Sequence, residues 1–280
     1  MKGIMIQGTA SSVGKSLIAT VLCRLFYEEG FRVAPFKAQN VTHHFYINTN
    51  GEKIAKSQAI QARAANTEPS VLMNPTSLTF GSCQSEVNVF GKPDGAFSRN
   101  SKSVYEGWIT AIQSSLHQLE KQYDLLVLEG AGSPVELNLK ERDVSNMKTA
   151  ELADVPVLLV ADIQKGGVFA SIAGTLALLE PEEMERVKGI IINKFHGDKA
   201  QFQDGISLIE QISQLPVLGV LPHTVHCMKE EDDAVLLADN SQANTSNLPT
   251  DEEIDHLTQK MKRHLNWERI LEIAEQWGKQ

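Results

Sequence analysis

The chain has 280 residues, a formal charge of −9 and 42% apolar residues, and it contains three cysteines. A chain of this length buries about three quarters of its unfolded surface, as one large domain or two small ones. The acidic balance argues against binding to nucleic acid or to a membrane through bulk charge. Three widely spaced cysteines argue against a disulfide framework or a zinc site, and no targeting segment is visible. We therefore expect a cytoplasmic protein that acts on small molecules.

Short apolar runs alternate with longer segments of helical period along the chain. The apolar runs predict strands at 3–7, 32–35, 124–129, 156–161, 187–193 and 216–220. Helical spacing predicts helices at 15–29, 171–179 and 202–211. The strand runs are apolar at successive positions, as expected when helices cover both faces of a parallel sheet. The predicted class is an α/β fold with a mostly parallel sheet, which binds its ligands beyond the carboxyl ends of the strands.

A polar stretch at 239–249 interrupts the pattern. It predicts a linker between a main domain at 1–238 and a helical tail at 250–280. Thr250 and Glu253 form a capping-box pattern at the start of the tail, and Asn266 is placed to begin a second helix. We expect the tail to pack on the main domain, with a partner-binding helix as the alternative.

The strongest motif lies between the first predicted strand and the first predicted helix. This loop consists of Gly8, Thr9, Ala10, Ser11, Ser12, Val13, Gly14, Lys15 and Ser16. Such a loop wraps a triphosphate with its N–H groups, while the lysine reaches the β- and γ-phosphates and the serine hydroxyl binds Mg²⁺. Thr9 occupies the position where the motif usually has its first glycine. The alternative to a phosphate-binding loop is an ordinary glycine-containing turn between the strand and the helix. The loop also has no second lysine of the kind that dimerising switch ATPases carry.

Several polar residues follow predicted strands and therefore fall at the ligand edge of the sheet. Glu129 supplies an oxygen donor of the kind that a Mg²⁺-bound triphosphate needs, with a merely solvated carboxylate as the alternative. Asp162 is placed similarly after the next strand. Asn193 could either present its amide to the edge of a nucleotide base or simply form a turn. Lys37 is placed to neutralise a phosphate or a substrate carboxylate.

These residues belong to a longer series of motifs at 8–16, 35–40, 58–62, 73–75, 129–139, 142–147, 166–170, 192–195 and 219–222. Through this series, which runs in family order from residue 1 to about 238, the sequence closely resembles the N-terminal synthetase domain of cobyric acid synthase. That family lies in the dethiobiotin-synthetase-like branch of P-loop NTPases. The resemblance implies a ligase that uses ATP and Mg²⁺ to amidate corrin carboxylates through an acyl phosphate.

The resemblance also implies roles for individual residues. Lys15, Lys37 and Glu129 would be catalytic, and Ser16 and Glu129 would bind the metal. Asn193 would lie at the adenine end of the nucleotide. The carboxylate and phosphoryl region would contain Lys37, Gln39, Asn40, Arg142, Gly166 and Gly167.

Two departures from the family leave alternatives open. The family's amidotransferase half, with its Cys nucleophile and His–Glu pair, has no counterpart in these 280 residues. We therefore expect ammonia from solution or from a separate glutaminase subunit, and a homodimer is compatible with the sequence. Polar or charged family residues are also replaced at positions 12, 44–45, 77–80, 164 and 196. The alternatives are a ligase for another substrate, as dethiobiotin synthetase is, and a nucleotide-dependent regulatory protein.

Overall fold

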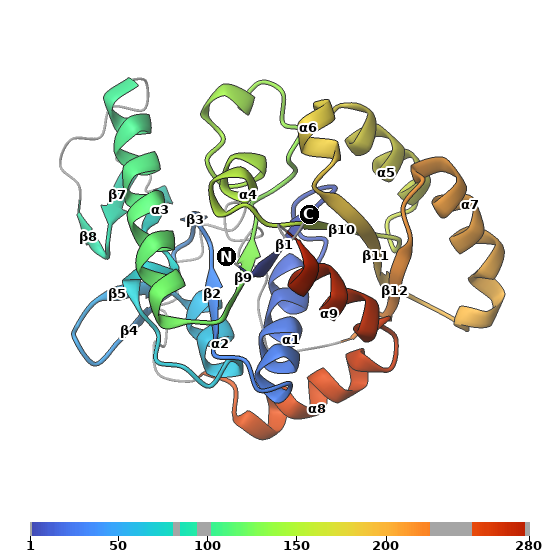
Figure 1. Cartoon of the computed structure of the whole chain (residues 1–280), viewed down its shortest axis with the longest axis horizontal. Coiled ribbons are helices and arrows are strands. Elements are labelled where there is room, and N and C mark those ends of the chain that lie inside the picture. Colours follow the sequence, from blue (N-terminus) through green and yellow to red (C-terminus); the bar gives the residue numbers. More distant parts are fainter. Residues whose placement is uncertain (1, 81–84, 94–101, 225–247, 278–280) are drawn as a thin grey trace.

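The computed structural model describes residues 2–80, 85–93, 102–224 and 248–277 (Figure 1). A sheet of six parallel strands, in the order β12-β11-β10-β1-β9-β2, forms its centre. The strands are β1 (Gly3–Gly8), β2 (Val33–Phe36), β9 (Leu125–Glu129), β10 (Val157–Asp162), β11 (Val187–Phe195) and β12 (Val217–Pro222). The predicted α/β class is confirmed, and every predicted strand ends within two residues of an observed one.

Helices cover both faces of this sheet. On one face pack α1 (Lys15–Glu28) and the tail helices α8 (Asp251–Lys262) and α9 (Trp267–Gln276). On the other face lie α3 (Lys102–Gln122), α4 (Met147–Ala153), α5 (Val168–Ala177) and α7 (Gln203–Ser213). The short helices α6 (Pro181–Met184), η2 (Lys140–Arg142) and η3 (Lys199–Phe202) lie in the connections.

The two helical layers explain why the central strands are apolar at every position. Successive side chains of a strand point to opposite faces of the sheet. In β9, Leu125 and Val127 belong to the core beneath α1, whereas Leu126 and Leu128 belong to the core beneath α3 and α4. All four are buried, so an alternating pattern would place a polar group in one of the two cores.

A smaller unit between β2 and β9 was not predicted from the sequence. It contains a sheet in the order β3-β6-β7-β8, in which β3 is parallel to β6 and the other pairs are antiparallel. The strands are β3 (Gln39–Val41), β6 (Thr76–Phe80), β7 (Ser85–Val89) and β8 (Lys92–Pro93). A hairpin of β4 (Phe45–Ile47) and β5 (Lys53–Ala55), the helix α2 (Lys56–Ala64) and the turn η1 (Val71–Met73) complete it.

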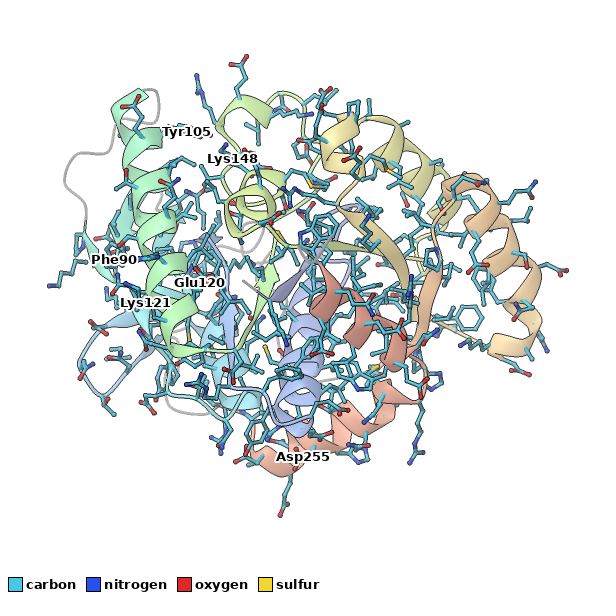
Figure 2. The ribbon with its side chains drawn as sticks, viewed as in Figure 1. Phe90, Tyr105, Glu120, Lys121, Lys148 and Asp255 are labelled. Carbon is cyan, nitrogen blue, oxygen red and sulfur yellow. The ribbon has the colours of Figure 1, made fainter. Side chains whose placement is uncertain are left out.

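The tail packs on the main domain, as predicted. The ring of Trp267 contacts that of Phe26 at a centroid distance of 4.8 Å, and Arg24 pairs with Asp251 at 2.7 Å. Arg24 also reaches Asp255, which Figure 2 labels on α8. The predicted capping box at Thr250 is present, and Asn266 caps α9. The predicted linker lies outside the described residues except for 248 and 249.

Helix α5 begins at Val168, three residues before its predicted start at position 171. Gly166 and Gly167 have φ values of 76° and 72°, so the chain makes a left-handed turn and enters the helix directly afterwards. Among the described residues, no helix combines the length and the apolar character that crossing a membrane requires.

Candidate nucleotide-binding and catalytic site

The predicted phosphate loop connects β1 to α1. Thr9 N–H donates to the Val160 carbonyl at 2.9 Å, which fixes the start of the loop to the neighbouring strand β10. Helix α1 has Gly14 as its N-cap, with no capping side chain and no acidic residue in the first turn. The N-cap residue therefore offers no side chain to the first N–H groups of the helix. A helix N-terminus of this kind binds phosphate groups.

The end of β11 holds this loop in place. The Asn193 amide is buried and donates from Nδ2 to the Val13 carbonyl at 2.8 Å, while Lys194 Nζ donates to the Ser12 carbonyl. Gly14 has a φ of 98°, and a Cβ atom there would lie 2.0 Å from Asn193 Nδ2. A glycine is therefore required at this position. Asn193 lies against the P-loop, and its role at the adenine end stays a prediction.

Lys15 connects the P-loop to the loop after β9. Its ammonium group is buried and donates to the Ala10 carbonyl at 3.1 Å and to the Gly132 carbonyl at 3.0 Å. The lysine of the motif thus lies between two loops at the carboxyl edge of the sheet. Both loops offer backbone groups to a ligand that enters there.

Glu129 is the centre of a buried polar cluster. Its Oε1 atom accepts hydrogen bonds from Ser16 Oγ at 2.6 Å and from Lys37 Nζ at 3.0 Å, and its Oε2 atom accepts one from Gln61 Nε2 at 2.6 Å. The side chains of Lys37 and Glu129 are 2% and 1% exposed. The alternative of a merely solvated carboxylate is therefore wrong.

The sheet register explains why residues 92 positions apart meet. Phe36 of β2 lies opposite Leu128 of β9, so the next residues, Lys37 and Glu129, emerge side by side at the carboxyl edge. The Lys37 backbone is held as well, because its N–H donates to the Met73 carbonyl at 2.9 Å and its carbonyl accepts from Asn74 Nδ2 at 3.0 Å. The strand pairing thus delivers a lysine and a carboxylate to one point.

The loop after β9 is fixed by Asn146. Its Oδ1 accepts the Ala131 N–H at 3.1 Å, and its Nδ2 donates to the Ala131 carbonyl at 2.7 Å. A Cβ atom on Gly130 would lie 2.2 Å from Asn146 Oδ1, so glycine allows this close approach. Asn146 also donates to Asp143, but burial outweighs this bond and raises the pKa of Asp143. These hydrogen bonds tie the loop that follows Glu129 to the N-cap of α4.

A hydrogen-bonded chain leads from the small sheet to Glu129. Asn40 Nδ2 donates to Gln58 Oε1 at 2.6 Å, Gln58 Nε2 to Gln61 Oε1 at 3.4 Å, and Gln61 Nε2 to Glu129. Gln39 precedes Asn40 on β3, and its Nε2 atom is buried without a hydrogen-bond partner among the described residues. An unsatisfied buried donor is costly, and a ligand oxygen would satisfy it.

Three residues predicted at the substrate lie apart from this chain. Arg142 is exposed in η2, in the connection from β9 to α4. Gly166 and Gly167 are exposed at the start of α5, and neither has an atom within 4 Å of the position of an added Cβ. Their roles in binding the substrate stay predictions.

The sequence reasoning did not select Gln61, Gln58 or Asn146 as site residues, although they supply hydrogen bonds within it. All three lie in stretches that match the family, at 58–62 and 142–147. The presence of polar residues in those family-matching stretches was the signal that could have identified them as site residues. A glutamine inside a helix is otherwise indistinguishable from a surface residue.

The oxygen atoms of Ser16 and Glu129 fit a magnesium ion. They lie 2.6 Å apart at the P-loop, and Mg²⁺ takes oxygen ligands in near-octahedral geometry. Among the described residues, no three His, Cys, Asp or Glu side chains gather in a metal-binding cluster.

The fold and this site define a P-loop nucleotide-binding protein. The chain belongs to the family of CobQ/CobB/MinD/ParA nucleotide-binding domains, which matches residues 4–237. A solved structure with a similar arrangement, the MinD cell division protein of Aquifex aeolicus, has a TM-score of 0.47 and 12% identity over 94% of this chain and 98% of its own.

The predicted resemblance to cobyric acid synthase is confirmed. The cobyric acid synthase of Pelotomaculum thermopropionicum is 46% identical over 245 residues, and that of Clostridium botulinum strain Okra is 48% identical over 240 residues. These alignments cover 86% and 84% of this chain. That of Desulforamulus reducens is 45% identical over 95% of this chain. The chain spans about half the length of these relatives, at 47%, 48% and 52%.

Proposed function

We propose that this chain is an ATP-dependent amidoligase that converts carboxylates of a corrin into amides, as the name of its relatives suggests. In the first step, an oxygen of the substrate carboxylate bonds to the γ-phosphorus of ATP, and ADP leaves with the electrons of the broken bond. In the second step, ammonia bonds to the acyl carbon and phosphate leaves. The nitrogen gives up one proton, which the phosphate takes.

The buried Lys37–Glu129 pair beside the P-loop is the observation that carries this proposal. A P-loop alone binds a nucleotide. A second lysine, held at the carboxyl edge by a carboxylate that also contacts Ser16, adds a fixed positive charge where the γ-phosphate would meet an acceptor. Phosphoryl transfer depends mainly on positioning and on neutralising the transferred group.

The site residues divide into two groups in this proposal. The loop from Gly8 to Ser16 wraps the phosphates, and Lys15 exchanges its two backbone carbonyl contacts for phosphate oxygens. Ser16 and Glu129 would hold Mg²⁺, which when bound neutralises charge on the phosphates. Lys37 then orients the acceptor carboxylate and the transferred phosphoryl group.

The remaining predicted residues serve the acceptor. The unsatisfied Nε2 of Gln39 is suited to donate to a carboxylate oxygen or to an amide of the corrin. We also infer that Asn40, Arg142, Gly166 and Gly167 border the substrate. Ammonia would come from solution or from a separate glutaminase subunit. The location would be cytoplasmic, and a homodimer would be compatible with the proposal.

The test is substrate-dependent turnover. The protein is incubated with Mg·ATP and ammonium, with and without cobyrinic acid a,c-diamide, and ADP and the mass of the corrin are followed. The proposal predicts substrate-dependent ADP and a corrin mass lower by one unit for each amidation. Lys15→Ala should abolish both signals, whereas Lys121→Ala, at the far end of α3 (Figure 2), should leave both unchanged. Tight ATP binding without either signal would favour another carboxylate substrate or a regulatory role.

A further inference from the structure

A polar pocket lies at the β12 edge of the central sheet, where the tail joins it. The segment between α8 and α9 pairs with this edge through an antiparallel bridge between Gly219 and Leu265. Val220 N–H donates to the His264 carbonyl at 3.3 Å, and Asn266 N–H donates to the Leu218 carbonyl at 2.7 Å. The connection between the tail helices is therefore fixed to the sheet.

The pocket has a volume of about 240 Å³. Backbone and side chains of β12, the α8–α9 connection, Ile206 of α7 and Lys199 of η3 surround it. Three of the side chains are basic, namely Lys199, Arg263 and His264. Among the described residues that line it, none is acidic. The pocket is therefore lined by positive charge in a chain whose formal charge is −9.

The basic side chains have no acidic partners in the described part of the chain. Lys199 and Arg263 are exposed and form no ion pair there. Two carboxylates on neighbouring elements accept hydrogen bonds from backbone groups. Asp198 accepts the Ala200 N–H at 3.0 Å, and Glu210 accepts the Val217 N–H at 2.9 Å. In the described part of the chain, no carboxylate therefore forms an ion pair with Lys199, Arg263 or His264.

Stabilisation of the C-terminal end of α8 explains only some of the basic side chains that line the pocket. Basic residues at the end of a helix offset its dipole, which accounts for Lys260 and Lys262 in the last turn and for Arg263 at the C-cap. The carbonyls of Met261 and Lys262, however, already accept the N–H groups of the next turn, at 2.9 and 3.1 Å. Lys199 comes from η3 and has no such role. It brings a third basic side chain to the pocket from the other side.

We propose that this pocket is a binding site for a small oxyanion of the inorganic phosphate type, held by Lys199, Arg263 and His264. The volume is below the roughly 300–1,000 Å³ of pockets that enclose larger organic ligands, which favours a small ion as the occupant. A phosphate would bridge η3 of the main domain to the junction of the tail helices. Binding would strengthen the attachment of the tail.

The electrostatics of His264 support an anion in this position. Burial and the charges of Lys199, Lys260 and Arg263 lower the pKa of His264. The charged groups that face it, from η3 and α8, are all cations, and the pocket residues of β12 and α7 are not titratable. A bound dianion would favour the imidazolium and raise this pKa. By linkage, the anion should bind more tightly as the pH falls through the pKa of His264.

The test follows the His264 ring by NMR, with the signal assigned from a His264→Gln variant. Sulfate is the probe, because its charge is constant over about pH 5–8, where histidine titrates, and inorganic phosphate is compared with it. Sodium chloride keeps the ionic strength constant. We expect sulfate to shift the ring signal in a saturable way and to move the titration of His264 to higher pH.

Variants separate this pocket from the P-loop, which also binds oxyanions. In Lys199→Gln/Arg263→Gln we expect affinity to fall by about tenfold or more, since two charged contacts are lost. Lys260→Gln, which removes the same charge from α8 outside the pocket lining, should weaken binding by less than about threefold. Lack of a saturable shift in the wild-type protein, or an equal shift in the double variant, would overturn the proposal. Lys15→Ala should leave the response of His264 unchanged.

Discussion

Replacing Glu129 by glutamine tests whether the Lys37–Glu129 pair is the electrostatic centre of the site. Both side chains are almost completely buried, so water cannot stabilise the charge that remains on Lys37. Removing one partner of a buried ion pair costs about 3–5 kcal/mol. The glutamine amide has two orientations. In one its NH₂ group faces the donor of Gln61, and in the other it faces the donors of Ser16 and Lys37. At least one hydrogen bond is lost.

The assay is urea unfolding at constant temperature. With a slope of about 1–3 kcal/mol per molar urea, such a loss shifts the midpoint by at least about 1 M. Glu120→Gln is the control, because this carboxylate lies on the exposed side of α3 (Figure 2) and its replacement should change stability by less than about 0.5 kcal/mol.

A double variant separates the charge from the packing. Lys37→Met together with Glu129→Gln leaves no unpaired charge in the cluster, so it should be more stable than Glu129→Gln alone by about 1–3 kcal/mol. The reasoning would be refuted if each single substitution cost less than about 1 kcal/mol and the two costs were additive. That result would mean that solvent screens the pair.

Three further predictions concern the nucleotide and the tail. Lys15→Ala should abolish Mg·ATP binding in equilibrium dialysis, and unchanged affinity would contradict the placement of the phosphates. Trp267→Ala should lower the free energy of unfolding by about 3–5 kcal/mol, because this buried ring packs on α1. The control Trp277→Ala should lower it by less, and equal losses for the two variants would contradict the tail packing. The hydrogen bond from Arg24 lowers the pKa of Asp251 below its ordinary value of 3.8. The ionised Asp251 carboxylate therefore adds to the free energy of unfolding above that pH, and this stabilisation is lost as the pH falls. Asp251→Asn should destabilise the protein by less than about 1 kcal/mol at neutral pH and by a shrinking amount below about pH 4. A pH-independent difference in urea titrations would contradict the last prediction.

The parallel sheet, the P-loop and the docked tail could all be predicted from the sequence. Continuous apolar runs identify strands that are buried on both faces, and a capping box such as Thr250 with Glu253 marks a helix start within four residues. These signals are local. They depend on neighbouring residues and on the period of the apolar pattern.

The small sheet and the centre of the site could not be predicted in the same way. Strands such as β3 (Gln39–Val41) are only three residues long, and two of the three residues are polar, so the sequence shows no apolar period there. Lys37 and Glu129 could be placed at the same edge, but their direct contact depends on which strands are neighbours in the sheet. Gln61 reaches Glu129 from a helix in the small unit, across 68 positions. Pairings of that kind are set by tertiary structure.

The measurement that tests the central claim most directly is the transfer of oxygen-18 from substrate to phosphate. The protein is incubated with ammonium, Mg·ATP and a corrin whose carboxylates are labelled with oxygen-18, and the phosphate that forms is analysed by mass. Phosphoryl transfer to the carboxylate predicts one labelled oxygen in the phosphate for each amide formed. Unlabelled phosphate, released at the same rate with or without the corrin, would contradict the claim and show that the site hydrolyses ATP without activating a carboxylate.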